Sequence, residues 1–338
     1  MRKILITSNT LSTVFQQIKE QIGGKLEIKS KEFRLEINND IATGRILGML
    51  VENAISYIEY DITFKESVSF VKKNYDTDSI HFGYCSKGEV TQSFGEFNNH
   101  NRLSQFQTGI FSNSSTKSTY LKFIKNEEVK FSMITVDVLS VSDKELKSQL
   151  QNTFLMNEDN NVFSYVGSFN LKIVDKIEYL NTINQKGLIR NLLINSTVYH
   201  ILALEIEQHK YDLINANASN NSLTQADMEA IKDISELIKN YPEIQYSVRY
   251  LSKKSGLSPF KLQEGFKIMH NRTVTDFIRN VRVEAAENLI RTSELNISEI
   301  VYTIGLTSRS YFSKIFKAKY NCSPKFYQNQ QNRLVITA

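Results

Sequence analysis

The feature that most constrains the fold is a short set of turn and capping residues between two stretches of helical sequence. Gly256 can adopt the left-handed backbone that a tight turn requires, and Ser258 can cap the helix that follows. Pro259 suits the first turn of that helix, where its missing N–H costs nothing. Apolar residues at helical spacing flank the turn: Leu251, Leu257, Leu262 and Phe266. The pattern predicts a helix-turn-helix unit over about 248–269.

The same pattern returns 49 residues later, counted from Gly256 to Gly305. Asn296 can cap a short helix, Gly305 can make a turn one residue longer, and Ser308 can cap a second helix. Phe312 and Phe316 form the inward face of that second helix, so a second unit is predicted over about 297–319.

Between the two units, residues 273–276 can cap a longer helix that carries one apolar stripe up to residue 289, which predicts a rigid spacer helix. The second helix of each unit is expected to end at an asparagine, Asn271 or Asn321. Asparagine tolerates the left-handed position at a helix end nearly as well as glycine does.

From about residue 232 to 330 the chain resembles the DNA-binding domain of the AraC/XylS family of transcription regulators. The matching stretches are LSKKSGLS (251–258), LQEGFK (262–267), RVEAAENLI (282–290), IGLTSRSYFSKIFK (304–317) and SPKFY (323–327). Asn271 and Asn321 replace a usual glycine, Val301 a usual small residue and Gln328 a usual arginine; the last two put some packing and one backbone contact in doubt. The phrase KLQEGFK (261–267) also resembles the branch that contains siderophore-responsive regulators.

The resemblance implies that the second helices, about 258–269 and 308–319, enter successive major grooves of double-stranded DNA, roughly 34 Å apart. Side chains turned away from the predicted helix cores are the candidates for base contacts, because arginine can bind guanine, glutamine can bind adenine and glutamate can only accept. The base-contact candidates are Phe260, Lys261, Gln263, Glu264, Arg309, Ser310, Ser313 and Lys314. The phosphate candidates are Ser258, Lys267, Ser308 and Lys317, of which the two lysines would supply salt-dependent affinity.

The charges divide the chain into two parts. Residues 241–338 contain 15 Lys and Arg against 7 Asp and Glu, a balance of +8 within a chain total of +5, and the first 240 residues therefore carry −3. All three prolines also lie after residue 241, and the small polar run around 215–222 is typical of a linker. We expect a sensing or dimerisation domain over 1–212, a linker over 213–223 and the DNA-binding domain over 224–338.

The composition, with 41% hydrophobic and 23% charged residues, is typical of a globular protein able to bury a core. No stretch is apolar enough for a membrane span or a signal-peptide core, and the two cysteines cannot form a disulfide framework. A cytoplasmic protein without membrane partners is the simplest interpretation.

Short runs of alternating aromatic and β-branched residues from about Ile55 to Val138 predict an antiparallel sandwich or barrel. From Asp143 the period becomes helical: Phe169, Ile173, Ile177 and Leu180 form one stripe, and residues 187–211 form a helix with excess apolar surface. That helix either covers the β domain or also forms a dimer seam. The family resemblance implies a cupin-like β-barrel with flanking helices, so the predicted fold class is multidomain α+β, ending in an all-α domain.

The β domain carries no pattern typical of an enzyme. Its histidines are scattered, and His81 with Cys85 does not complete a metal site. Phosphate loops and nucleophile elbows are missing, so no cofactor, metal or catalytic residue is predicted. A hollow apolar barrel that binds a small molecule stays open, with Tyr60, Phe70, Phe82 and Tyr84 as wall candidates.

The leading hypothesis is a homodimeric, sequence-specific transcription regulator whose β domain binds a small-molecule effector or dimerises, with RNA polymerase as a partner if it activates. The alternative is a constitutive DNA-binding regulator whose N-terminal domain only dimerises. A β-barrel enzyme with a DNA-binding tail is disfavoured by the missing catalytic groups. The operator, the effector and the sign of regulation are not predicted.

Overall fold

The computed structural model describes residues 1–52, 54–73, 78–96, 100–113, 117–155, 162–215 and 223–336 of the chain. It divides into two compact units, Met1–Ser219 and Asn220–Ala338. Most of the expected linker, residues 216–222, lies outside the described residues.

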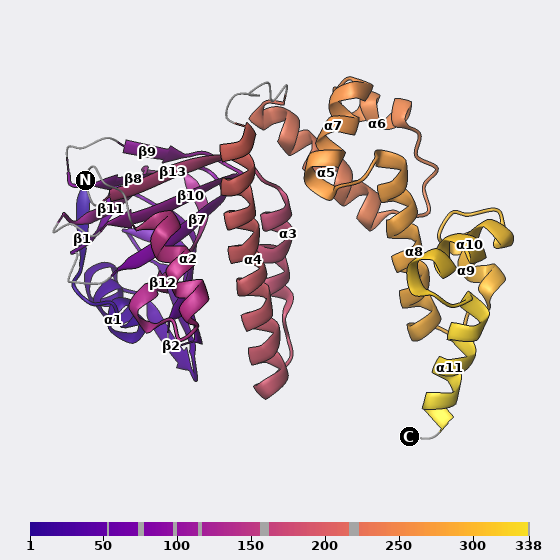
Figure 1. The fold of residues 1–338 in the computed structure, drawn as a ribbon, viewed down its shortest axis with the longest axis horizontal. Coiled ribbons are helices and arrows are strands. Elements are labelled where there is room, and N and C mark those ends of the chain that lie inside the picture. Colours follow the sequence, from indigo (N-terminus) through magenta and orange to yellow (C-terminus); the bar gives the residue numbers. More distant parts are fainter. Residues whose placement is uncertain are drawn as a thin grey trace. The chain divides into compact units, whose positions relative to one another are not determined.

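The N-terminal unit is a β structure with helices (Figure 1). In chain order its elements are β1 (Arg2–Ile6), α1 (Leu11–Ile22), β2 (Lys25–Lys29), β3 (Glu32–Asn38), β4 (Ala42–Glu52), β5 (Ile55–Phe64), β6 (Val68–Lys72), β7 (Ser79–Lys87), β8 (Val90–Phe94), β9 (His100–Leu103), β10 (Gln107–Asn113), β11 (Thr119–Phe123), β12 (Glu128–Asp137), the 3-10 helix η1 (Val138–Ser140), α2 (Lys144–Phe154), β13 (Val162–Phe169), α3 (Lys172–Thr182) and α4 (Gly187–Asn215).

Two sheets build this unit. One has the strand order β1-β6-β11-β8-β9, and the other has the order β13-β10-β7-β12-β5-β4-β3-β2. Among the described strands, β1 and β6 pair in parallel and the other pairs are antiparallel. Apolar side chains from both sheets and from α1 form one continuous core, with Phe15, Phe70 and Phe131 among its buried members. The predicted β domain is present, built largely of antiparallel sheet.

Two details of the sequence prediction were wrong. The alternating runs recognised in the sequence begin at Ile55, whereas the structure has four strands before that residue, β1 to β4. Of these, β2, β3 and β4 belong to the larger sheet. Phe169 is the last residue of β13, which pairs with β10, and does not belong to the helical stripe. The rest of that stripe is correct, since Ile173, Ile177 and Leu180 are buried on α3.

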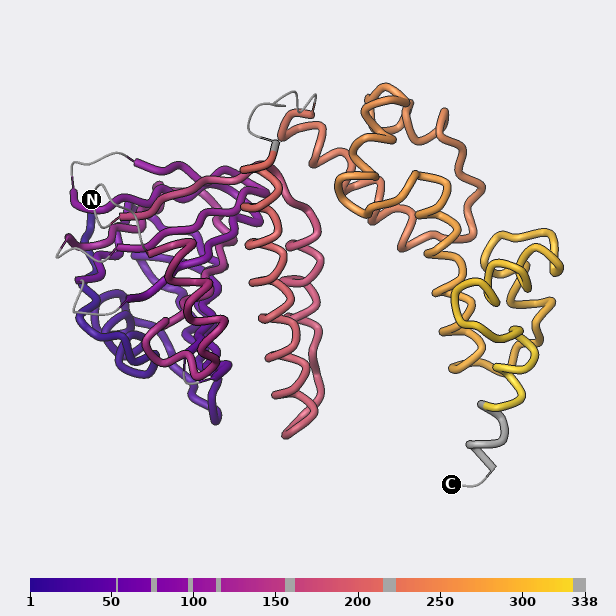
Figure 2. The backbone as a smooth tube through the Cα atoms, in the orientation of Figure 1, coloured from indigo at the N-terminus to yellow at the C-terminus, as the bar shows by residue number. Residues whose placement is uncertain are grey.

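Helix α4 is fastened to the larger sheet near both of its ends. The guanidinium of Arg190 donates to both carboxylate oxygens of Glu32 on β3, at 2.6 and 2.7 Å. Near the other end, Asp212 accepts from the hydroxyl of Tyr165 at 2.5 Å and from the backbone of Ser168 at 2.8 Å. Helices α3 and α4 lie side by side (Figures 1 and 2). The helix expected over 187–211 therefore covers the β structure.

The C-terminal unit is entirely helical in the residues described (Figure 1). Its elements are α5 (Gln225–Asn240), α6 (Val248–Ser255), α7 (Pro259–His270), α8 (Val274–Thr292), α9 (Ile297–Thr303), α10 (Arg309–Tyr320) and α11 (Pro324–Ile336). It opens on a capping box, in which Thr224 and Asp227 each bond to the other's backbone N–H, at 2.7 and 3.2 Å. None of the helices within the described ranges is long and apolar enough to cross a bilayer.

Candidate nucleic-acid interface

The first helix-turn-helix unit is built from α6 and α7, and its turn has the predicted geometry. Gly256 closes α6 with φ of 73°, in the left-handed region. Ser258 then caps α7, with its hydroxyl accepting from the backbone N–H of Lys261 at 3.2 Å, and Pro259 occupies the first turn. Leu251, Leu262 and Phe266 are fully buried between the helices. The exposed residues of α7 are Pro259, Phe260 and Lys267.

The second unit, α9 and α10, repeats that arrangement. Asn296 and Glu299 form the expected capping box, with bonds of 2.7 and 3.1 Å, and Gly305 makes the turn with φ of 75°. The hydroxyl of Ser308 accepts from the backbone N–H of Tyr311 at 3.2 Å and so caps α10. Phe312 and Phe316 are fully buried, as predicted.

Both second helices end as the sequence predicted. Asn271 after α7 and Asn321 after α10 adopt left-handed backbone conformations, with φ of 54° and 58°. In each case the N–H of the asparagine bonds to the carbonyl of the lysine four residues earlier, Lys267 or Lys317, at 2.9 Å. Asparagine thus replaces glycine here without loss of the helix end.

Two structures hold the units at a fixed separation. Helix α8 runs from the first unit to the second (Figure 2). The segment 241–247, here called the strap, lies against both α8 and the second turn. Arg282 of α8 is buried and donates to the carbonyl oxygens of Pro242 and Ile244, at 2.8 and 2.9 Å. Burial lowers the pKa of Arg282 from its usual value.

The strap also contacts the turn of the second unit. The side-chain amide of Gln245 donates to the carbonyl of Gly305. A Cβ atom placed on Gly305 would lie 2.8 Å from the Cα of Glu243, well inside van der Waals contact. Glycine is therefore required at 305 for two reasons, the left-handed backbone and the approach of the strap.

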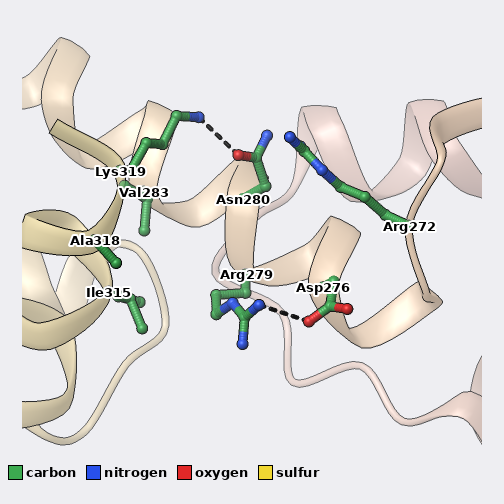
Figure 3. Close-up of a pocket in the computed structure, with 8 residues that line it drawn as sticks. All are labelled: Arg272, Asp276, Arg279, Asn280, Val283, Ile315, Ala318 and Lys319. Atoms are coloured by element: carbon green, nitrogen blue, oxygen red, sulfur yellow. Dashed lines mark hydrogen bonds and ion pairs between the residues drawn. The ribbon is translucent and has the colours of Figure 1, made fainter.

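A groove of about 330 Å³ lies between α8 and α10 (Figure 3). Lys319 of α10 bonds to Asn280 and Glu284 of α8, at 2.7 and 2.5 Å, and Arg279 pairs with Asp276 at 2.6 Å. Lys319 therefore holds the second unit to the spacer helix, and it is not free to bind a phosphate on the exposed side of α10.

Most of the predicted contact residues are exposed. Exposed candidates on or before α7 are Ser258, Phe260 and Lys267, and those on or before α10 are Ser308, Arg309, Ser310, Lys314 and Lys317. The remaining four, Lys261, Gln263, Glu264 and Ser313, are half-buried. Each of the two helices therefore carries an exposed lysine, Lys267 on α7 and Lys317 on α10, on the same face as its polar candidates.

At least two of the half-buried candidates are engaged within the unit. The ammonium of Lys261 pairs with Asp227 at 2.6 Å, which ties α7 to the start of α5. The side-chain oxygen of Gln263 accepts from the backbone N–H of Val274 at 3.2 Å, at the start of α8. Reading an adenine needs the amide to donate and accept together, so Gln263 would first have to give up this bond.

Sequence reasoning missed several exposed aromatic residues of this unit. Tyr250, Tyr302, Tyr311 and Phe326 all keep large exposed surfaces. Their signal was available, since each stands off the apolar stripe of its helix. It also missed Arg282 and the strap, for which the local sequence gives no signal because the bonded carbonyls lie about 40 residues earlier.

Comparisons with known proteins agree with this architecture. Residues 251–330 match the model of a helix-turn-helix domain family. The HTH-type transcriptional regulator AlkR of Acinetobacter baylyi is 32% identical over 93 residues, 28% of this chain and 30% of AlkR. The regulatory protein SoxS of Escherichia coli is 29% identical over 100 residues, 30% of this chain and 94% of SoxS. Residues 251–330 therefore form a helix-turn-helix domain of the AraC/XylS type.

The matched relatives include a transcriptional regulator, AlkR, and a regulatory protein, SoxS. The AraC/XylS unit is also found in larger proteins, since histidine kinase P4 of Formosa agariphila is 33% identical over 110 residues. That match covers 32% of this chain and only 8% of the kinase, so the chain spans a small part of that relative, and 30% of AlkR.

Solved structures are similar to the chain at low overall scores. The C-terminal domain of the response regulator yesN from Fusobacterium nucleatum is 32% identical, covers 30% of this chain and 98% of its own, and has a TM-score of 0.28. An apo variant of ToxT from Vibrio cholerae is 15% identical, covers 82% of this chain and 97% of its own, and has a TM-score of 0.32.

Proposed function

We propose that the protein is a sequence-specific transcription regulator that binds double-stranded DNA through α7 and α10. The observation that carries this proposal is the pair of capped helix-turn-helix units, which α8 and the strap hold at a fixed separation. Two recognition helices held in this way suit successive major grooves on one face of DNA, about 34 Å apart.

The proposed DNA contacts are of two kinds, contacts to bases and contacts to phosphates. Arg309 can donate two bonds to guanine, while Ser310, Ser313 and Lys314 offer further donors along α10. On α7, Phe260 can contact a thymine methyl, and Glu264 can accept from cytosine; Lys261 and Gln263 complete the set once released from Asp227 and Val274. Ser258, Lys267, Ser308 and Lys317 are proposed for phosphate contacts, which give affinity without sequence information.

The test begins by selecting bound fragments from genomic DNA with the intact chain, because the neighbouring genes would also indicate the regulated pathway. On a selected site, Arg309→Ala should reduce discrimination between operator variants by about 1–3 kcal/mol. Lys317→Ala should weaken binding to all DNA sequences similarly. It should also reduce the slope of log affinity against log salt concentration by about one.

Arg291→Ala is the matched control, since Arg291 is an exposed cation of the same unit at the end of α8 and outside the proposed contact faces. If Arg309→Ala leaves both specificity and affinity unchanged, the second unit does not bind bases as proposed.

For the N-terminal unit we propose a cupin-like sensing domain that also dimerises, in a cytoplasmic protein. Its helix α4 keeps Leu188, Ile189 and Leu192 between 59 and 73% exposed beside one another, a cluster that a second copy could cover. Leu192→Glu should convert a dimer to a monomer in light-scattering measurements, and Ser196→Glu one turn along should not. If the protein activates transcription, RNA polymerase is a further proposed binding partner.

Domain boundaries follow the same proposal: 1–212 for sensing and dimerisation, 213–223 for the linker, of which 213–215 are the last residues of α4, and 224–338 for DNA binding. The last fragment should bind DNA alone and more weakly than a dimeric intact chain. The alternative is a constitutive regulator whose N-terminal unit only dimerises; operator binding that no metabolite changes would favour it.

A further inference from the structure

A cavity of about 90 Å³ lies between the two sheets of the N-terminal unit, next to α1. The smaller sheet supplies Phe70, Leu121 and Gln92, which the strand registers place in one row across β6, β11 and β8. The next row along supplies Lys72 and Thr119. This side of the cavity therefore carries two nitrogen donors among apolar groups.

The larger sheet provides the opposite wall. Its registers place Ser56, Thr135, His81 and Phe111 in one row, and Tyr60 with Phe131 in another. Leu11, Val14 and Ile18, which lie on one face of α1, close one end. Most of the lining is aliphatic or aromatic, which is typical of a small-molecule site that uses a few polar groups for orientation.

Two of the four aromatic wall candidates lie in the lining of this cavity, and two do not. Tyr60 and Phe70 line the cavity, whereas Phe82 and Tyr84 do not. Successive residues of a strand point to opposite faces, so these two even-numbered residues of β7 lie on the face away from His81. Phe82 packs on Phe154 of α2, and the Tyr84 hydroxyl donates to the backbone of Asn170.

Among the described residues, no carboxylate forms an ion pair with Lys72. Its ammonium has no hydrogen bond or ion pair with any residue in the described ranges, and burial lowers its pKa to about 8. The acidic group that opposes this effect is Asp137, but that carboxylate already accepts from Leu139 at 3.1 Å and from Ser140 at 2.7 Å. A cation that lies largely out of water and without a partner is costly unless a ligand supplies the charge.

Gln92 adds an independent indication. It is 2% exposed, and its side-chain oxygen accepts from Asn101 at 2.8 Å, which directs the amide nitrogen the other way. That nitrogen is buried and has no hydrogen-bond partner. Unsatisfied buried donors are rare in folded proteins, so one that lines a cavity beside an unpaired lysine points to a missing acceptor.

His81, also in the lining, has no metal partner in reach. Its Nδ1 lies 2.9 Å from the Thr135 hydroxyl, and Cys85 stands four residues along the strand, roughly 13 Å away. No group of three metal-ligating side chains occurs in the described parts of the chain. Burial and the neighbouring Lys72 lower the pKa of His81 to about 3, so the imidazole is neutral and adds no second positive charge.

We propose that this cavity binds a small monocarboxylate with a compact branched or aromatic body, its carboxylate held by Lys72 and Gln92. Charge-assisted hydrogen bonds from the ammonium and the amide satisfy the two unpartnered groups, and the apolar body displaces water from the lining. Each water-sized group needs about 10–15 Å³ of cavity volume, so a cavity of about 90 Å³ holds roughly six to nine such groups. A long acyl chain would not fit in that space. This inference rests on the proposed sensing role of the N-terminal unit.

The test measures binding to the intact chain by calorimetry without DNA, with 3-methylbutanoate and benzoate as probes. Each should bind once per chain and at least about tenfold more tightly than 3-methylbutanamide, which has the same shape as the first probe without its charge, or acetate, which lacks the body. Lys72→Met should weaken both carboxylates at least about tenfold and remove the preference over the amide. Lys73→Met, at the exposed neighbouring position, should change nothing.

A second readout separates a binding lysine from a structural one. Without ligand, Lys72→Met should leave the melting temperature unchanged or raise it, because it removes an unpaired charge while keeping the aliphatic stem. Gln92→Leu should weaken the carboxylates in the same way.

The proposal is overturned if neither probe binds the wild-type chain up to about 10 mM, a concentration that detects weak binding. It is equally overturned if Lys72→Met binds both probes as tightly as wild type. Since DNA is absent from these measurements, neither result bears on operator binding by α7 and α10.

Discussion

The contact between the strap and the second turn gives a prediction that isolates one steric effect. Gly256 and Gly305 occupy equivalent turns with nearly equal φ angles of 73° and 75°. A Cβ on Gly256 would meet nothing within 4 Å, whereas one on Gly305 would press into the backbone of Glu243. Alanine therefore introduces the same backbone strain at both positions. Only alanine at position 305 also places its Cβ against the backbone of Glu243.

The magnitudes follow from these two terms. The left-handed backbone costs an alanine about 1–2 kcal/mol, so Gly256→Ala should destabilise its unit by that amount. Overpacking a closed contact adds about 1–3 kcal/mol for Gly305→Ala. Since about 1.4 kcal/mol is a factor of ten, the extra term should raise the opening equilibrium of the second unit roughly 5- to 150-fold.

Hydrogen exchange followed by mass spectrometry on the intact chain measures both variants without separating the two domains. Peptides over 297–310 report the second turn, and peptides over 248–260 report the first. Only Gly305→Ala should also increase exchange in the strap, because the displaced segment loses the bond that its Gln245 donates to Gly305 and the bonds that it accepts from Arg282. Equal costs for the two variants, within about 0.5 kcal/mol, or an unchanged strap in Gly305→Ala, would refute the reasoning.

Three further predictions test buried and paired groups. Arg282→Met should cost about 2–4 kcal/mol and raise exchange in the strap, because it leaves two carbonyl oxygens without their donor. Burial raises the pKa of Glu205 well above its usual range, and one of its oxygens has no partner, so stability of the N-terminal unit should fall as pH rises above about 4 towards that raised value. Glu205→Gln should remove this pH dependence and be more stable than wild type at pH 7, measured by melting at several pH values. For Asp227, burial alone would raise the pKa, but the bonds from Lys261 and Thr224 outweigh it and lower the pKa. Asp227→Asn should cost about 1 kcal/mol at neutral pH, and the difference should shrink as pH falls below about 4 and vanish only below the lowered pKa, where wild type loses the pair.

The sequence predicted the C-terminal unit closely because the signals that define it are local. The hydroxyl of Ser258 reaches a backbone N–H three residues on, and Asn271 adopts the left-handed turn at the end of its own helix. Such interactions involve residues only a few positions apart in the sequence. The positions of both turns and both caps could therefore be predicted from single residues.

The N-terminal unit was predicted less well because its pairings are long-range. β1 pairs with β6 more than 60 residues away, and β13 returns to β10, so neither strand is defined by its own alternation alone. The faces of β7 could have been separated by period two, but which face meets the second sheet depends on that sheet's position. Lys72 resembled any strand-end lysine until the registers placed it opposite His81 and beside Thr119.

The two helix-turn-helix units differ in how free their candidate side chains are, and this difference bears on where discrimination arises. On α7, Lys261 and Gln263 already bond to Asp227 and Val274, so any contact with DNA yields only the difference between the new bond and the old one. On α10, Lys314 is exposed and without an internal partner in the described residues, and Arg309 makes a single exposed bond of 3.2 Å to Ser298. The free energy of base contact is therefore less offset in the second unit. If both helices bind DNA as proposed, base substitutions under α10 should cost more affinity than those under α7.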